Sequence, residues 1–173
     1  AVNFPSITAE EAPKLKPFVA LAEKLGQFAG QVADGGLSEV EIEYEGAVAQ
    51  LNRKPLTSAA LAGMLRPFLA EVNMVSAPAI LQERGGSLKE SINEASPVYD
   101  SLIRIKVKVD GKWRSVAGAI VGGKPRIVEV KGMALEADFQ PFMVFVNNSD
   151  KPGFIGAMAG LLGDAKVNIA TFN

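Results

Sequence analysis

The chain has 173 residues, of which 48% are hydrophobic and 21% charged, and its formal net charge is -1. Such a composition is ordinary for a globular protein with a packed core, and its balanced charge predicts binding neither to nucleic acid nor to an anionic membrane. Because histidine and cysteine are absent, imidazole bases, thiolate nucleophiles and Cys/His metal sites are excluded. Catalysis by carboxylates, lysine or tyrosine stays open in principle, but we expect no catalytic residue, no metal and no bound cofactor.

No apolar run reaches the roughly 18 residues that a membrane-spanning helix needs. The first residues lack the pattern of a secretory signal. A cytoplasmic location is therefore the default expectation.

The first predicted element is a helix. Thr8 and Glu11 have the spacing of a capping box. Apolar residues then recur at helical spacing from Phe18 to Val32, and the run Asp34-Gly35-Gly36 ends the pattern.

A strand is predicted next, over Leu37–Glu45, where glutamates alternate with apolar residues. Residues two apart on a strand lie about 6–7 Å from each other, too far for a tight metal shell. The four glutamates therefore indicate a solvated edge face rather than a metal site. The following segment, Gly46–Asn52, is a candidate for a second short strand.

Two helical segments follow. Pro55 opens a helix that continues to about Val72 and is interrupted by Pro67. The segment Asn73–Arg84 predicts a turn and a short helix, which Gly85-Gly86 closes.

The remaining strands of this part come close together in the sequence. Leu102–Val109 and Trp113–Gly122 alternate in hydrophobicity, and the Asp110-Gly111 turn between them is a strong hairpin signal. Lys124–Val130 supplies a further strand, which the Lys131-Gly132 turn follows. Residues 1–140 are thus expected to form one α+β domain.

After Pro141 a new pattern begins, which predicts a second domain over residues 141–173. Phe142–Val146 has the composition of a strand, and a polar loop separates it from a helix over Phe154–Lys166. Val167–Phe172 begins another strand. The order is β-α-β.

This last part resembles the first half of an ACT domain, the ligand-binding module of amino-acid-regulated enzymes. The resemblance depends on the loop Asp150-Lys151-Pro152-Gly153, the helix end Leu161-Leu162-Gly163 and the segment Val167-Asn168-Ile169-Ala170. It implies that the chain stops inside this domain.

The upstream part resembles the intervening, or allosteric-substrate-binding, domain. The segments that carry the resemblance are Leu21–Gly26, Asn73–Pro78 and Glu83–Gly85. An intervening domain followed by an ACT domain is the order found in long-form bacterial D-3-phosphoglycerate dehydrogenases, and the chain resembles the C-terminal part of this family.

The resemblance implies an α+β fold, in which an intervening domain of mixed sheet and packed helices precedes the β-α-β half of a ferredoxin-like ACT domain. It implies a regulatory and oligomerisation fragment of a homo-oligomeric parent, a dimer or tetramer. The parent would oxidise D-3-phosphoglycerate to 3-phosphohydroxypyruvate with NAD, which opens L-serine biosynthesis, and L-serine would inhibit it.

Motif alignment with the family places Asp150 and Asn168 on its serine-binding positions, with Asn148 as a weaker third. Gly153 lacks a Cβ and would let the effector's carboxylate approach the backbone at the start of the following helix. The alternative for Asp150 is that it only caps this helix.

A second anion site is a further expectation, since intervening domains of relatives can hold one. The candidates are Lys124, Arg126 and Lys131. Acidic residues sit among them, so solvated strand charges are favoured over a phosphate site.

Two other functions stay open at this point. The chain also fits the corresponding domain pair of an L-serine dehydratase, which carries a similar domain and an ACT module. The other is a stand-alone amino-acid sensor.

Overall fold

The computed structural model describes residues 7–33, 38–146 and 151–169. The chain divides into two compact units, Ala1–Phe139 and Gln140–Asn173. Over the described residues, the first unit holds a sheet and three α-helices, and the second holds one helix. The predicted α+β class is confirmed.

The first helix, α1 (Ala12–Ala33), begins with the predicted capping box. The backbone N–H of Glu11 donates to Thr8 Oγ1 at 3.3 Å, and the backbone N–H of Thr8 donates to Glu11 Oε2 at 3.1 Å. Two amides that precede the helix thus obtain partners. The hydroxyl of Thr8 also lowers the pKa of the Glu11 carboxyl by donating to it.

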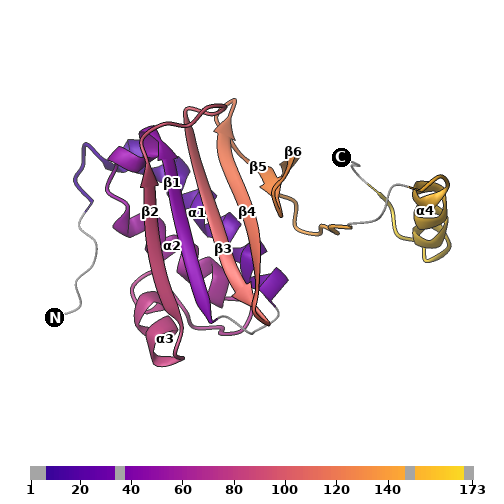
Figure 1. Cartoon of the computed structure of the whole chain (residues 1–173), viewed down its shortest axis with the longest axis horizontal. Helices are drawn as coiled ribbons and strands as arrows, with labels where there is room; N and C mark the ends of the chain where they lie inside the picture. The colour runs from indigo at the N-terminus through magenta and orange to yellow at the C-terminus, as the bar shows by residue number, and fades with distance from the viewer. Residues whose placement is uncertain (1–6, 34–37, 147–150, 170–173) are drawn as a thin grey trace. The chain divides into compact units, whose positions relative to one another are not determined.

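In the described residues, six strands form one mixed sheet in the order β2-β1-β3-β4-β5-β6 (Figure 1). Their bounds are β1 Glu39–Gly46, β2 Ser87–Asn93, β3 Ser101–Val109, β4 Lys112–Val121, β5 Lys124–Val130 and β6 Met133–Asp138. Of the neighbouring pairs, β1 and β2 run parallel, because the helices α2 (Lys54–Leu65) and α3 (Ala77–Glu83) connect them.

Tight turns join the strands from β3 to β6. In the first and last of them, Asp110-Gly111 and Lys131-Gly132, both residues have positive φ, between 50° and 77°. These are the backbone angles of the turns that match the twist of a hairpin, so both turn predictions are confirmed.

The predicted short strand at Gly46–Asn52 is wrong, because residues Ala47–Gln50 form a 3₁₀ turn. Gly46 has a φ of 75°, and a Cβ there would overlap the carbonyl oxygen of Asp100. The chain therefore leaves the sheet at Gly46. The helix that contains Pro55 ends at Leu65, so the prediction that it continues to about Val72 is wrong, although its end just before Pro67 is where a proline interrupts a helix.

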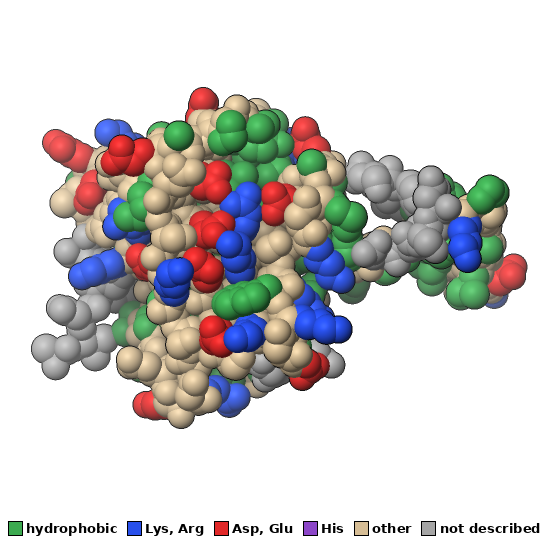
Figure 2. All heavy atoms as spheres, in the orientation of Figure 1, with side chains coloured by type: hydrophobic (Ala, Val, Ile, Leu, Met, Phe, Trp, Pro, Cys, Tyr) green, Lys and Arg blue, Asp and Glu red, His purple; other side chains and the backbone are tan. Residues whose placement is uncertain are grey.

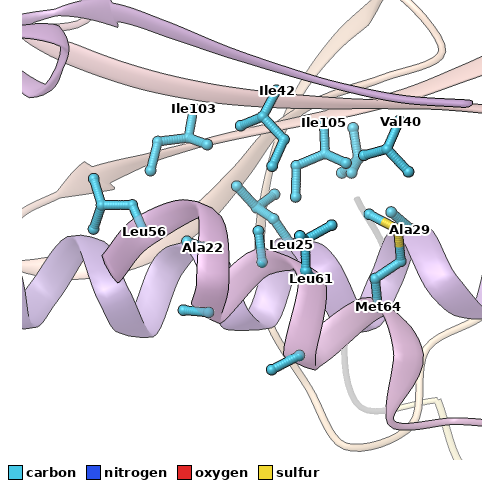
Figure 3. Packing of buried hydrophobic residues seen from close by; sticks show 14 of the residues in the cluster. Ala22, Leu25, Ala29, Val40, Ile42, Leu56, Leu61, Met64, Ile103 and Ile105 are labelled. Atoms are coloured by element: carbon cyan, nitrogen blue, oxygen red, sulfur yellow. The ribbon is translucent and has the colours of Figure 1, made fainter. Parts of the chain in front are cut away.

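One face of the sheet is covered by α1 and α2 (Figure 1). The core between them is apolar: Ile42, Ile103 and Ile105 of the sheet point toward Leu25 and Leu61 of the helices (Figure 3). The opposite face of the sheet carries none of the helices described in this unit and is called the open face below.

The second unit contains α4 (Phe154–Asp164), as predicted. No residue of α4 is fully buried, and Phe154, Met158 and Leu162 are half-buried along one side. No strand forms at Phe142–Val146, because none of the described residues provides a neighbouring strand for its amides. Residues 167–169 are not in a strand either, and the rest of that prediction lies outside the described residues.

Candidate functional site

The open face carries rows of opposite charge on neighbouring strands. Register places the β1 glutamates opposite the β3 cations, so Glu39 faces Lys108 and Glu43 faces Arg104. Figure 2 shows this face, with acidic and basic side chains interleaved over the middle of the sheet. The expectation of a solvated edge face is therefore wrong, since β1 lies between β2 and β3 and its glutamates are partly buried and ion-paired.

Arg104 connects three carboxylates from two strands. Its Nη1 lies 2.8 Å from Glu43 Oε2 and 2.6 Å from Glu45 Oε1, and its Nε lies 3.1 Å from Glu129 Oε1. Lys106 also bonds to Glu43. This cluster links β1, β3 and β5 across the open face.

The cluster shifts two pKa values. Burial alone would raise the pKa of the Glu43 carboxyl, but hydrogen bonds and charge from Lys106 and Arg104 outweigh it, so the pKa lies below its ordinary value. Burial would lower the pKa of the Arg104 guanidinium, and the bonds to Glu129, Glu43 and Glu45 raise it instead. Both groups stay charged at neutral pH.

A shallow hollow of about 290 Å³ opens on the same face, lined by Glu41, Lys106, Trp113 and Ser115. Trp113 is about half exposed, with 48% of its surface accessible. The ammonium of Lys108 lies 5.7 Å from the centre of its ring. Charged, hydroxyl and aromatic groups thus meet at one place on the open face.

On the covered face, a polar chain runs from the core to the edge of the sheet. The Tyr44 hydroxyl lies 2.7 Å from Thr57 Oγ1, and Thr57 donates to Glu90 Oε1 at 2.5 Å. Because the Thr57 proton goes to Glu90, Tyr44 is the donor in the first bond. Burial raises the pKa of Tyr44 above its ordinary value, so its phenol stays protonated in the folded chain.

The three candidate anion-binding residues do not converge. Lys124 and Arg126 lie at the start of β5, whereas Lys131 follows its end, roughly 20 Å further along the strand. Arg126 Nε lies 3.0 Å from Asp138 Oδ1, and Arg126 Nη1 lies 3.7 Å from Glu136 Oε1, both on β6. An anion would have to compete with these carboxylates.

Two of the candidate effector residues lie in the described part of the second unit. Gly153 caps the start of α4 with a left-handed φ of 88°, and Asn168 follows the helix and is exposed. Gly153 is open to solvent, because a Cβ added to it would meet no atom within 4 Å. Asp150 and Asn148 lie outside the described residues.

The hollow on the open face does not follow from the sequence. The sequence predicts the strand at Trp113 and its hairpin with β3, but the pairing of β3 with β1 depends on register between residues about 55 to 70 positions apart. The alternation of glutamates in β1 and of cations in β3 is the signal that could have indicated it. Within the described ranges, no group of carboxylates is placed to hold a metal, and no helix is long and apolar enough to cross a membrane.

Known proteins resemble this chain along almost its whole length. Residues 14–131 match the family profile of the D-3-phosphoglycerate dehydrogenase intervening domain. A D-3-phosphoglycerate dehydrogenase of Methanocaldococcus jannaschii is 37% identical over 98% of this chain and 32% of its own length. The Bacillus subtilis protein of the same name is 35% identical over 99% of the chain and 33% of its own length. The chain spans about a third of the length of these curated relatives.

Proposed function

This chain belongs to the family of D-3-phosphoglycerate dehydrogenase intervening domains, and we propose that it is the regulatory, non-catalytic region of such an enzyme. The match over residues 14–131 carries the proposal, because it covers strands β1 to β5 and the helices that pack on them. The alignment with relatives continues through nearly all of the chain, so it includes α4 as well.

The parent enzyme would oxidise D-3-phosphoglycerate to 3-phosphohydroxypyruvate with NAD. The relatives support this by their names, and their further length leaves room for nucleotide-binding and catalytic domains. In this assignment the present chain binds neither NAD nor the substrate at a reacting centre. The alternative of an L-serine dehydratase has no matching support among these relatives.

The second unit would bind the effector, L-serine. Gly153 and α4 support this part of the proposal: the helix dipole favours a carboxylate at the helix start, and Gly153 leaves the backbone accessible there. The carboxylate of Asp150 would then accept hydrogen bonds from the ammonium group of L-serine. Asn168 and the weaker candidate Asn148 would form further hydrogen bonds with the effector.

We further propose that the parent is a homo-oligomer. Two large apolar side chains of α4, Ile155 and Leu161, are 59% and 71% exposed. Since no residue of α4 is fully buried either, this helix offers apolar side chains for contact with a second copy. Light scattering on the parent at increasing concentration tests this, and a monomer throughout would contradict it.

The non-catalytic assignment is tested on the purified 173-residue chain. We expect no saturable enhancement of NADH fluorescence and no NAD reduction with D-3-phosphoglycerate. Saturable enhancement would overturn the assignment. A chimera tests the regulatory role. The matching segment of the Bacillus subtilis relative is replaced by this chain, and the chimera is assayed for dehydrogenase activity and for its response to L-serine.

A further inference from the structure

The hollow on the open face arises because two directly opposed charges point away from each other. Register places Glu41 of β1 opposite Lys106 of β3, and Lys106 opposite Ser115 of β4. Directly opposed side chains have Cβ atoms about 5 Å apart, close enough to form an ion pair. Instead, Glu41 Oε1 lies 3.3 Å from Lys89 Nζ, and Lys106 bonds to Glu43. The space between the two side chains is left open.

The lining of the hollow also includes an aromatic side chain, Trp113. Trp113 lies two residues from Ser115 on β4, so both side chains face the same side of the sheet. It is half exposed although it lies on a sheet face rather than in a loop. The ring therefore presents a π surface next to a carboxylate, an ammonium and a hydroxyl.

These groups select one class of ligand. A simple anion would meet Glu41, and a simple cation would meet Lys106, so neither is favoured. A molecule with adjacent positive and negative ends has a partner of opposite charge for each end, Glu41 for the positive and Lys106 for the negative. Since the Lys108 ammonium already lies 5.7 Å from the centre of the indole ring, the ring contributes an apolar surface for the carbon atoms of the ligand rather than a site for its positive end. A volume of about 290 Å³ is just below the roughly 300 Å³ at which small-molecule pockets start, so only a small ligand fits.

We propose that this hollow binds a small zwitterionic amino acid. Its ammonium group lies toward Glu41, its carboxylate lies toward Lys106 and Ser115, and its carbon atoms lie against Trp113. This site is on the first unit, distinct from the effector residues proposed in the second, and it does not depend on the proposed function.

The chain contains its own reporter, because Trp113 is its single tryptophan. Glycine, L-alanine and L-serine are titrated into the 173-residue chain while Trp113 emission is recorded. Acetate and methylammonium, which carry only one end of the zwitterion, are titrated at matched ionic strength. We expect a saturable change with at least one amino acid and none with acetate or methylammonium.

Variants locate the binding. Glu41→Gln is expected to weaken the amino acid's apparent affinity at least about tenfold, and Ser115→Ala more mildly. Lys112→Met, on the same strand but outside the lining of the hollow, is the matched control and should leave affinity unchanged. Asn168→Ala should also leave it unchanged, which separates this site from the effector residues. Thermal unfolding of each variant shows whether it is folded.

Three results would overturn the proposal. One is the lack of any saturable change up to the solubility limit of the amino acids. Another is an equal response to acetate or methylammonium, which would indicate general quenching. The third is an affinity unchanged in a folded Glu41→Gln variant. Failure here leaves the proposed regulatory function untouched, since that function is tested through turnover and serine inhibition.

Discussion

Gly26 of α1 lies against the backbone of Ala60 in α2 so closely that a Cβ on Gly26 would overlap the Ala60 carbonyl oxygen. Gly30 is in the same position against Met64, one turn further along. The two helices therefore pack at a distance that only glycine permits, and this close packing brings both of them onto the sheet.

Gly26→Ala is expected to destabilise the first unit. Alanine favours a helix over glycine by about 0.5–1 kcal/mol, whereas forcing apart two packed backbones costs about 1–3 kcal/mol or more. The second effect is larger, so we expect a net loss of about 2 kcal/mol in the free energy of unfolding. Urea unfolding measures it. Gly156→Ala in α4, where a Cβ meets nothing within 4 Å, is the matched control and should not lower stability.

Arg104→Met should destabilise the chain strongly at neutral pH. It leaves three partly buried carboxylates without their shared cation, which we expect to cost about 2–3 kcal/mol. Lys89→Met is the control: Lys89 is 73% exposed and pairs with Glu41 at the surface, so its loss should cost less than about 0.5 kcal/mol. Equal effects of the two substitutions would contradict the assigned importance of the cluster.

The same variant should change how stability depends on pH. The folded-state pKa of Glu43 is lowered, so its contribution is present above the ordinary value of about 4.3 and is lost as pH falls through the lowered value. Without Arg104 this lowering is reduced. The difference in unfolding free energy between wild type and Arg104→Met is thus expected to shrink as the pH falls from about 7 toward about 3. A difference independent of pH would contradict this linkage.

Thr57→Val tests the polar chain on the covered face. Valine keeps the shape but leaves both the Tyr44 hydroxyl and the Glu90 carboxylate without their partner, at an expected cost of about 1–3 kcal/mol. Tyr44→Phe removes one end only and should cost less, about 0.5–1.5 kcal/mol. The double variant should be less destabilised than the sum of the two. Strict additivity in urea unfolding would show that the two residues are not coupled.

Local features of this fold are predictable from the sequence, whereas long-range ones are not. The capping box of Thr8 and Glu11 and the Asp110-Gly111 hairpin depend on residues a few positions apart, and both predictions are confirmed. The strand β2 is not predictable, because Ser87–Asn93 is largely polar and exposed and forms its ladder with β1, nearly 50 residues earlier. The three carboxylates of Arg104 come from two other strands, so no local pattern indicates them.

The candidate effector residues follow from the resemblance to the family and not from a pocket in the described residues. Gly153 has the predicted place at the start of α4, and this much follows from the glycine and the loop before the helix. The grouping of Asn168 with Asp150 stays a prediction. In the chimeric enzyme, Asp150→Ala and Asn168→Ala should each weaken inhibition by L-serine by about 1–3 kcal/mol while leaving turnover nearly unchanged. Asp164→Ala, at the end of α4, is the charge-matched control, and an inhibition constant unaffected by Asp150→Ala would show that this residue is not part of the site.

The proposed role of this chain is to regulate a D-3-phosphoglycerate dehydrogenase without taking part in its chemistry. Steady-state oxidation of D-3-phosphoglycerate by the chimera, measured as NAD reduction with increasing L-serine, tests this role most directly. We expect turnover close to that of the unmodified Bacillus subtilis enzyme and a saturable inhibition by L-serine. A folded chimera that binds NAD but does not turn over, or whose turnover is indifferent to L-serine, would contradict it.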